Sequence, residues 1–192
     1  MTAGKEIWLL RHGATEWSIN GRHTGSSDIP LLPEGETEAL ALAPLLKKKT
    51  FSRVWVSPMQ RAKRTCELAG LGAAAETNEL LREWNYGAYE GITTPEIRQT
   101  VPGWSVWSHG CPAGEDAAAV TKRCAQLIEL VLSVDGDVAL FAHGHILRSL
   151  GGTWMGLGAV GGRNLALGTA TFSVLGFERE NQVIMRWNAP CL

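Results

Sequence analysis

Three short apolar runs, far apart in the sequence, each lead directly into a polar segment that carries Arg or His. The runs are residues 7–10 (IWLL), 54–56 (VWV) and 138–142 (VALFA), and the segments after them begin RHG, SPMQRAKRT and HGH. Apolar runs this short, bounded by polar or turn residues, are typical of buried strands. A buried strand usually ends in turn residues, so three strands that end in cations constrain both the fold and the site.

Longer helical patterns separate these runs. The expected helices cover residues 34–48, 58–68, 117–132 and 145–155. Pro33 and Pro58 suit first helical turns, and Ser57 is the expected N-cap of the second helix. Pro44 lies inside the first helical pattern, where it would bend or shorten the helix.

The alternation of strands and helices predicts an α/β fold, a three-layer αβα sandwich with a mostly parallel central sheet. Residues 170–177 and 183–187 predict a terminal hairpin that adds an antiparallel edge to this sheet. The chain has 192 residues, no internal repeat and no linker-like tract, so residues 1–192 are expected to form a single domain.

Composition restricts the partners and the compartment that we expect. A formal net charge of −1 gives no general attraction to nucleic acid or to an anionic membrane, so any bound anion must meet a few placed cations. The longest apolar run near the N-terminus has four residues, too short for a signal peptide or a membrane span. Four cysteines without CxxC spacing indicate reduced thiols and a cytoplasmic protein. No pattern in the sequence specifies an oligomeric state.

The polar residues after the three runs are expected to meet. In open α/β sheets, ligands bind beyond the carboxyl ends of the strands, and parallel strands bring these ends to one edge. Arg11, His12, Arg61 and His143 would then converge there. Guanidinium groups donate paired hydrogen bonds to phosphate oxygens, and a neutral imidazole is a nucleophile. This set of side chains favours phosphoryl transfer.

The segments LLRHGATEW, SPMQRAKRT, LREWNYGAYEG and FAHGHILR occur in this order between about Ile7 and about Leu150. Together they resemble the histidine phosphatase superfamily, which includes the cofactor-dependent phosphoglycerate mutases. Within it, RHGATEWSINGRHTG and HGCPAGED are most similar to the sedoheptulose-bisphosphatase-like branch. The resemblance implies a phosphoglycerate mutase-like fold and a metal-independent phosphatase without a cofactor.

The same resemblance implies roles for the residues. His12 would be the nucleophile that becomes phosphohistidine, with Arg11, Arg61 and His143 completing the phosphate pocket. Glu83 would protonate the leaving alkoxide, which is a poor leaving group without a positioned acid.

The substrate is expected to be a phosphorylated small molecule, such as sedoheptulose 1,7-bisphosphate or fructose 1,6-bisphosphate. The expected substrate-binding residues are Thr24, Gly25, His23, Arg22, Ser57, Tyr86 and Arg148. Of these, Arg148 or Arg22 would meet a second anion of the substrate. Tyr86 would more commonly pack around its loop, and His145 either caps the next helix or joins the site.

Four other functions remain open from the sequence. A broad-specificity phosphomonoesterase needs only one phosphate pocket. A phosphoglycerate mutase-type phosphotransferase usually has further basic residues, whereas segment 91–116 lacks an arginine-rich stretch and the short tail carries little charge. A non-catalytic phosphate-binding domain would be expected to have lost the nucleophile or the acid. HGH together with His12 forms a possible metal-ligand trio, although two nearby arginines would repel a divalent cation.

Overall fold

The computed structural model describes residues 4–190. Within them, six strands form one sheet in the order β3-β2-β4-β1-β5-β6. The strands are β1 (Ile7–Arg11), β2 (Arg53–Val56), β3 (Ala75–Thr77), β4 (Val138–Ala142), β5 (Phe172–Glu178) and β6 (Asn181–Ala189). β1 to β4 run parallel, and β5 lies antiparallel to both β1 and β6. The predicted mostly parallel sheet with an antiparallel edge is confirmed.

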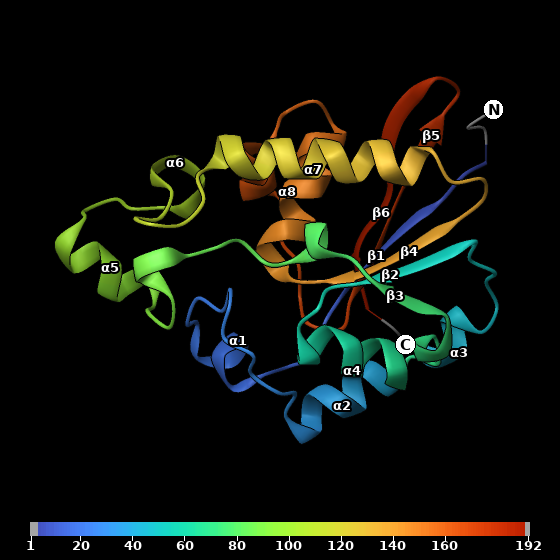
Figure 1. The fold of residues 1–192 in the computed structure, drawn as a ribbon, viewed down its shortest axis with the longest axis horizontal. Helices are drawn as coiled ribbons and strands as arrows, with labels where there is room; N and C mark the ends of the chain where they lie inside the picture. The colour runs from blue at the N-terminus through green and yellow to red at the C-terminus, as the bar shows by residue number, and fades with distance from the viewer. Residues whose placement is uncertain (1–3, 191–192) are drawn as a thin grey trace.

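Helices cover both faces of this sheet (Figure 1). On one face lie α2 (Pro33–Leu40), α3 (Ala43–Leu46) and α4 (Gln60–Leu68), and on the other lie α7 (Ala117–Leu132) and α8 (Gly144–Trp154). Beyond the sheet lie α1 (Glu16–Asn20), α5 (Thr94–Thr100) and α6 (Val106–His109). Short 3-10 helices are Gly72–Ala74, Glu79–Leu81, Gly87–Tyr89 and Ala159–Asn164. The three-layer αβα sandwich is thus confirmed.

The two covered faces explain why the parallel strands read as unbroken apolar runs. In β1, Ile7 and Leu9 pack into the core beneath α7 and α8, whereas Trp8 and Leu10 pack into the core beside α2, α3 and α4. Alternate side chains point to opposite faces of a strand, and both faces are buried here. Each position of the run is therefore apolar.

The helix predicted over residues 34–48 is divided into two helices around Pro44. The chain forms α2, which ends at Leu40, and the separate short α3. Pro44 has no N–H to donate, and its ring collides with the carbonyl four residues earlier in a continuous helix. That carbonyl belongs to Leu40, so the helix ends where the proline requires.

Several predicted boundaries differ in smaller ways. α4 starts at Gln60 after Met59, so Ser57 is not its N-cap. α8 starts and ends one residue before the predicted 145–155. The predicted hairpin is present, with β5 over Phe172–Glu178 in place of 170–177 and the longer β6 over Asn181–Ala189 in place of 183–187. β3 was not predicted because it is a three-residue edge strand without an apolar pattern.

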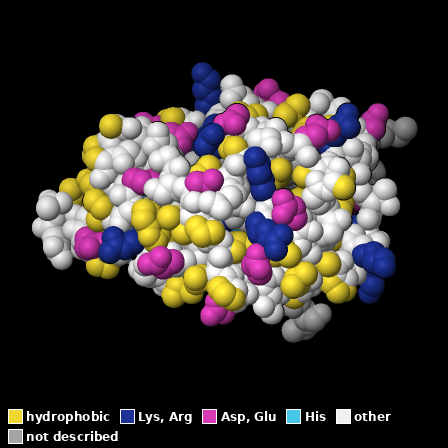
Figure 2. All heavy atoms as spheres, turned by 60° about the horizontal axis from the view of Figure 1, so that its bottom comes forward, with side chains coloured by type: hydrophobic (Ala, Val, Ile, Leu, Met, Phe, Trp, Pro, Cys, Tyr) yellow, Lys and Arg dark blue, Asp and Glu magenta, His cyan; other side chains and the backbone are white. Residues whose placement is uncertain are grey.

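The thiols and the surface agree with the composition. Cys66, Cys111 and Cys124 are buried and unpaired by disulfides, whereas Cys191 lies outside the described residues. Figure 2 shows a face on which Lys and Arg are interspersed with Asp and Glu, without a broad patch of one sign. None of the helices in residues 4–190 is both long and apolar enough to cross a membrane.

Candidate active site

The carboxyl ends of β1 and β4 bring two histidines together. Arg11 is aligned with Ala142 across the two strands, so His12 and His143 are the next residues on neighbouring strands. The His12 backbone N–H donates to the Ala142 carbonyl at 3.0 Å, and the two imidazole centroids are 5.2 Å apart. The predicted convergence of these strand ends is confirmed.

The His12 ring has a defined tautomer. Its Nδ1 lies 2.7 Å from the Gly13 carbonyl oxygen, which can only accept, so Nδ1 carries the proton and Nε2 carries a lone pair. Burial lowers the pKa of His12 well below its usual value, and the nearby charges of Arg11 and Arg61 lower it further. His12 is therefore a neutral imidazole at neutral pH, the form that attacks phosphorus.

The loop that carries His12 requires two glycines. A Cβ on Gly13 would lie 2.2 Å from the Gly35 carbonyl oxygen, and one on Gly35 would lie 2.1 Å from the Ala14 carbonyl oxygen. The loop thus runs directly against the first turn of α2. The Gly13 N–H also donates to Thr65 Oγ1 at 3.1 Å, which ties the loop to α4. These contacts fix the backbone on both sides of the nucleophile.

Arg61 and His143 lie behind His12. Both are fully buried, and neither lines the cleft. Arg61 Nε donates to His143 Nδ1 at 3.1 Å, so His143 carries its proton on Nε2, which lies 2.7 Å from Ser57 Oγ. The remaining Arg61 donors reach the carbonyls of Ser27 and Thr24. The structure thus gathers these residues as predicted but places Ser57, Arg61 and His143 one layer deeper than the cleft wall.

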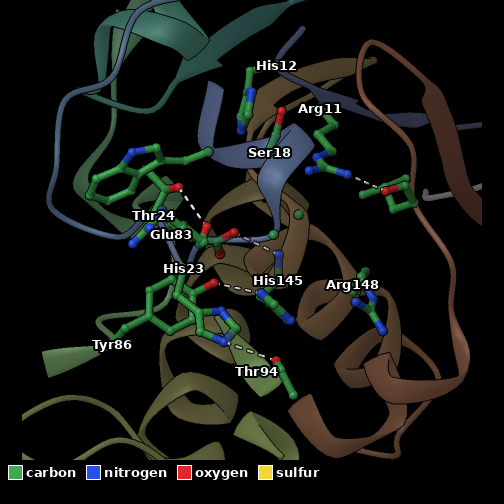
Figure 3. A pocket seen from close by; sticks show the side chains of 15 residues that line it. Arg11, His12, Ser18, His23, Thr24, Glu83, Tyr86, Thr94, His145 and Arg148 are labelled. Carbon is green, nitrogen blue, oxygen red and sulfur yellow. Dashed lines mark hydrogen bonds between the residues drawn. The ribbon is translucent and has the colours of Figure 1, made fainter. Parts of the chain in front are cut away.

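Arg11 is the cation that lines the cleft next to His12. Its Nη1 donates to the Leu167 carbonyl at 2.5 Å, as Figure 3 shows. Its buried Nε has no hydrogen-bond partner within the described part of the chain. A buried donor without a partner costs free energy, and an oxygen of a bound phosphate would satisfy it.

Glu83 lies in the cleft and is held by backbone donors. Its two carboxyl oxygens accept from the N–H groups of Trp84 at 2.9 Å and of His145 and Ile146 at 2.8 Å each. The last two groups belong to the first turn of α8, where backbone donors have no partner within the helix. Only 7% of Glu83 is exposed, so the carboxyl group has a fixed position near His12.

A cleft of about 270 Å³ opens in front of His12, close to the lower end of the roughly 300–1,000 Å³ range of small-molecule sites. Five of the predicted substrate-binding residues line it: Arg22 and the four that are labelled in Figure 3, His23, Thr24, Tyr86 and Arg148. Gly25 does not, because its N–H donates to the Glu90 carboxylate at 2.9 and 3.0 Å. That carboxylate also accepts from the Ser27 N–H, so Glu90 shapes the loop behind the cleft.

The cleft also contains residues that were not predicted: Trp17, Ser18, Thr94 and Leu167. Ser18 and Thr94 resemble ordinary helix-start residues in the sequence. His145, for which the sequence left a place in the site open, lines the cleft as well. Among residues 4–190, no group of three or more His, Cys, Asp or Glu side chains is placed to hold a metal ion.

The comparison with known families agrees with the geometry. The model of the histidine phosphatase superfamily (branch 1) matches residues 7–190. The chain belongs to this superfamily. The resemblance seen in the sequence motifs is therefore confirmed.

The relatives of this histidine phosphatase include an acid phosphatase and a sugar bisphosphatase. An acid phosphatase of Mycobacterium tuberculosis is 42% identical over 176 residues, covering 90% of this chain and 86% of that protein. A sedoheptulose 1,7-bisphosphatase of Saccharomyces cerevisiae is 31% identical over 182 residues, covering 78% and 67%. The solved structure of a Mycobacterium tuberculosis open reading frame product aligns with a TM-score of 0.94 at 38% identity, covering 98% and 100%. This histidine phosphatase is an enzyme that hydrolyses phosphate esters.

The buried histidines predict how stability depends on pH. Burial, together with neighbouring arginines, lowers the pKa values of His12, His143 and His145 well below 6.5 in the folded enzyme. Below this pH the unfolded chain binds protons that the folded chain cannot, so the free energy of unfolding falls as pH falls. Each histidine contributes up to about 1.4 kcal/mol per pH unit.

Urea unfolding at about pH 7.5, 6.5 and 5.5 measures this effect, in a range above the ordinary titration of carboxylates. We expect a lower midpoint at each step below about pH 6.5. An equal midpoint at the two lower pH values would show that the histidines are protonated in the folded enzyme.

Proposed function

We propose that this enzyme hydrolyses sugar bisphosphates, without a metal ion, through a phosphohistidine formed on His12. Ketose 1,7- and 1,6-bisphosphates are the proposed substrates. Three arginines line one small cleft, and one of them, Arg22, is exposed and donates to the Gly91 carbonyl. The observation that carries the proposal is that the other two lie on different elements: Arg11 at the end of β1 and Arg148 on α8. One would bind the reacting phosphate and the other the second phosphate.

In the first step, His12 Nε2 attacks phosphorus and forms an N–P bond while the ester P–O bond breaks. Glu83 gives its proton to the leaving alkoxide, so a sugar alcohol departs. In the second step, Glu83 takes a proton from water, whose oxygen attacks the phosphohistidine and releases inorganic phosphate. His12 returns to its neutral form. Arg11 would stabilise the charge on the equatorial phosphate oxygens in both steps.

The deeper residues support this chemistry by position and charge. Arg61 holds the backbone of the loop at residues 24–27 and orients His143, and both side chains lie directly behind the nucleophile. The positive charge of Arg61 is one of the causes that keep the pKa of His12 low. We assign both residues to the phosphate pocket as its buried support.

Arg148 is positioned by three contacts. Its Nε donates to the Gly162 carbonyl at 3.1 Å, its Nη2 donates to the Arg163 carbonyl at 3.3 Å, and its guanidinium carbon lies 4.8 Å from the ring centroid of Trp107. A guanidinium held in this way loses little further freedom when it binds an anion. A substrate anchored at both phosphates also gains orientation, which lowers the barrier to the chemical step.

The alternatives differ in what they require of the cleft. A broad-specificity phosphomonoesterase, which the relationship to an acid phosphatase favours, would need Arg11 and His12 but not Arg148. A mutase would have to return the phosphoryl group to a second oxygen and exclude water. Cleft residues between 91 and 116 include Thr94 but no arginine, which favours hydrolysis.

The preference for bisphosphates is tested by comparing kcat/KM for fructose 1,6-bisphosphate with that for fructose 6-phosphate, both with a chelator present. We expect the wild-type enzyme to prefer the bisphosphate, and we expect Arg148→Ala to lower this ratio about tenfold or more, because it removes a charge-assisted contact. Arg163→Ala, which removes a neighbouring cation outside the cleft, is the matched control. A wild-type kcat/KM ratio near one would indicate a broad-specificity phosphomonoesterase. Loss of activity when the chelator is added would contradict metal independence.

A further inference from the structure

The imidazole of His145 lies in the cleft wall, and the proposed reaction does not use it. Its Nδ1 is 2.6 Å from the Tyr86 hydroxyl oxygen, a distance typical of a strong hydrogen bond. The backbone N–H of His145 holds Glu83, but the ring itself projects into the cleft on the side of Arg148 (Figure 3). A polar ring held in the cleft wall in this way can contact a bound substrate.

The partner of His145 defines its tautomer. Tyr86 is 2% exposed, and its hydroxyl has no hydrogen-bond partner other than His145 within residues 4–190. A buried hydroxyl hydrogen needs an acceptor, so the tyrosine donates and His145 Nδ1 accepts. The proton of the neutral ring is then on Nε2. Burial, with the charge of Arg148 next in effect, lowers the pKa of His145 well below 6.5, so the ring is neutral at neutral pH.

Aromatic packing fixes the direction of this donor. The His145 ring centroid lies 5.1 Å from that of Trp107, 6.4 Å from that of Trp84 and 6.0 Å from that of His23. Trp107 also lies under the guanidinium of Arg148. One indole of α6 therefore positions both the neutral donor and the cation on this side of the cleft.

We propose that His145 determines specificity for the carbon skeleton of the substrate. Its Nε2–H donates a hydrogen bond to a hydroxyl or carbonyl oxygen of a polyol or ketose phosphate, and Tyr86 is the positioning residue that holds the ring in this tautomer. The inference rests on the proposed function only in that the reacting phosphate lies against Arg11 and His12.

A neutral hydrogen-bond donor can discriminate between substrates in a way that the arginines cannot. Arg11 and Arg148 attract any anion, whereas an N–H without charge is satisfied by an uncharged oxygen and is left unpaired by a substrate that lacks one. A site built to hydrogen-bond one substrate oxygen discriminates against analogues without it. His145 would thus select phosphorylated sugars over phosphate esters with apolar leaving groups.

The test compares kcat/KM for fructose 6-phosphate with kcat/KM for phenyl phosphate, whose leaving group has no oxygen besides the ester oxygen. Both substrates are monophosphates, so the ratio does not depend on the second anion. We expect His145→Phe and Tyr86→Phe, which keep the aromatic packing, to lower the ratio about tenfold. His145→Gln, which retains a side-chain N–H donor, should recover much of it, and His109→Gln on the exposed end of α6 should keep the wild-type ratio.

Nitrogen NMR of histidine-labelled enzyme gives an independent readout. We expect the wild-type spectrum to show His145 protonated on Nε2 with Nδ1 as an acceptor, and Tyr86→Phe to change the Nδ1 resonance. A wild-type ratio in His145→Phe, an equal loss in His145→Gln, or a proton on Nδ1 would each overturn the inference. A wild-type enzyme without preference for bisphosphates would instead contradict the proposed bisphosphate substrate. The kcat/KM ratio for the two monophosphates would still test the role of His145.

Discussion

We expect the His12→Ala enzyme to fold and to lose several orders of magnitude in kcat. The substitution removes the atom that attacks phosphorus, and the remaining donors bind phosphate without providing a covalent route. His12 is 5% exposed, and within residues 4–190 its side chain forms a hydrogen bond only with the neighbouring Gly13 carbonyl, so its loss leaves the strand ends in place. Steady-state hydrolysis of p-nitrophenyl phosphate measures the loss, and circular dichroism checks the fold.

Trapping of the covalent intermediate tests directly which residue is the nucleophile. Rapid quenching of the wild-type enzyme during turnover of labelled substrate should trap phosphate on His12 that is labile in acid and stable in alkali, as an N–P bond is. The His109→Gln enzyme, altered at an exposed histidine outside the cleft, should trap the same amount. Near-normal activity in His12→Ala, or label on another residue, would show that the nucleophile is assigned wrongly.

The second large effect concerns Glu83. We expect Glu83→Gln to slow hydrolysis of fructose 6-phosphate about 10²–10⁴-fold, because general acid catalysis is worth this much for an alkoxide leaving group. Hydrolysis of p-nitrophenyl phosphate should slow far less, since its leaving group scarcely needs a proton. The measurement is the ratio of kcat values for the two substrates, with Glu79→Gln, an exposed carboxyl of the same segment, as control.

The three backbone hydrogen bonds of Glu83 call for a stability control on this variant. Both Glu83 oxygens accept backbone N–H groups, and glutamine offers only one oxygen, so thermal unfolding of the variant must be compared with that of the wild type. An equal loss on both substrates would assign the acid to another carboxyl group. Glu90 is the next candidate in the sequence, although its carboxylate is bonded to the N–H groups of Gly25 and Ser27.

The sequence predicts the fold well where burial is complete. β4 and α7 have the predicted bounds because every residue of β4 is buried and Asp116 caps α7 through its bond to the Ala119 N–H. The convergence of Arg11, His12, Arg61 and His143 also follows from the sequence, since it requires only parallel strands and their carboxyl ends.

The depth of a side chain and the partner of a polar group are not predictable in this way. Arg61 and Ser57 were expected at the substrate, but carbonyls of the loop at residues 24–27 and the His143 ring use their hydrogen-bonding groups. These competitors lie more than 30 residues away in the chain. Tyr86 and His145 are 59 residues apart in the chain, so local sequence patterns do not predict their hydrogen bond either.

The first turn of α8 ties the chemical step to the choice of substrate. The helix holds the carboxyl of Glu83 at its start and presents Arg148 one turn later. Any shift of this helix moves both groups, so a change of preference made there would be accompanied by a loss of rate. Segment 91–116 contacts this side of the cleft through Trp107, whose indole packs against His145 and Arg148. Directed evolution towards new phosphate esters should therefore accept substitutions in that segment and reject those that displace α8.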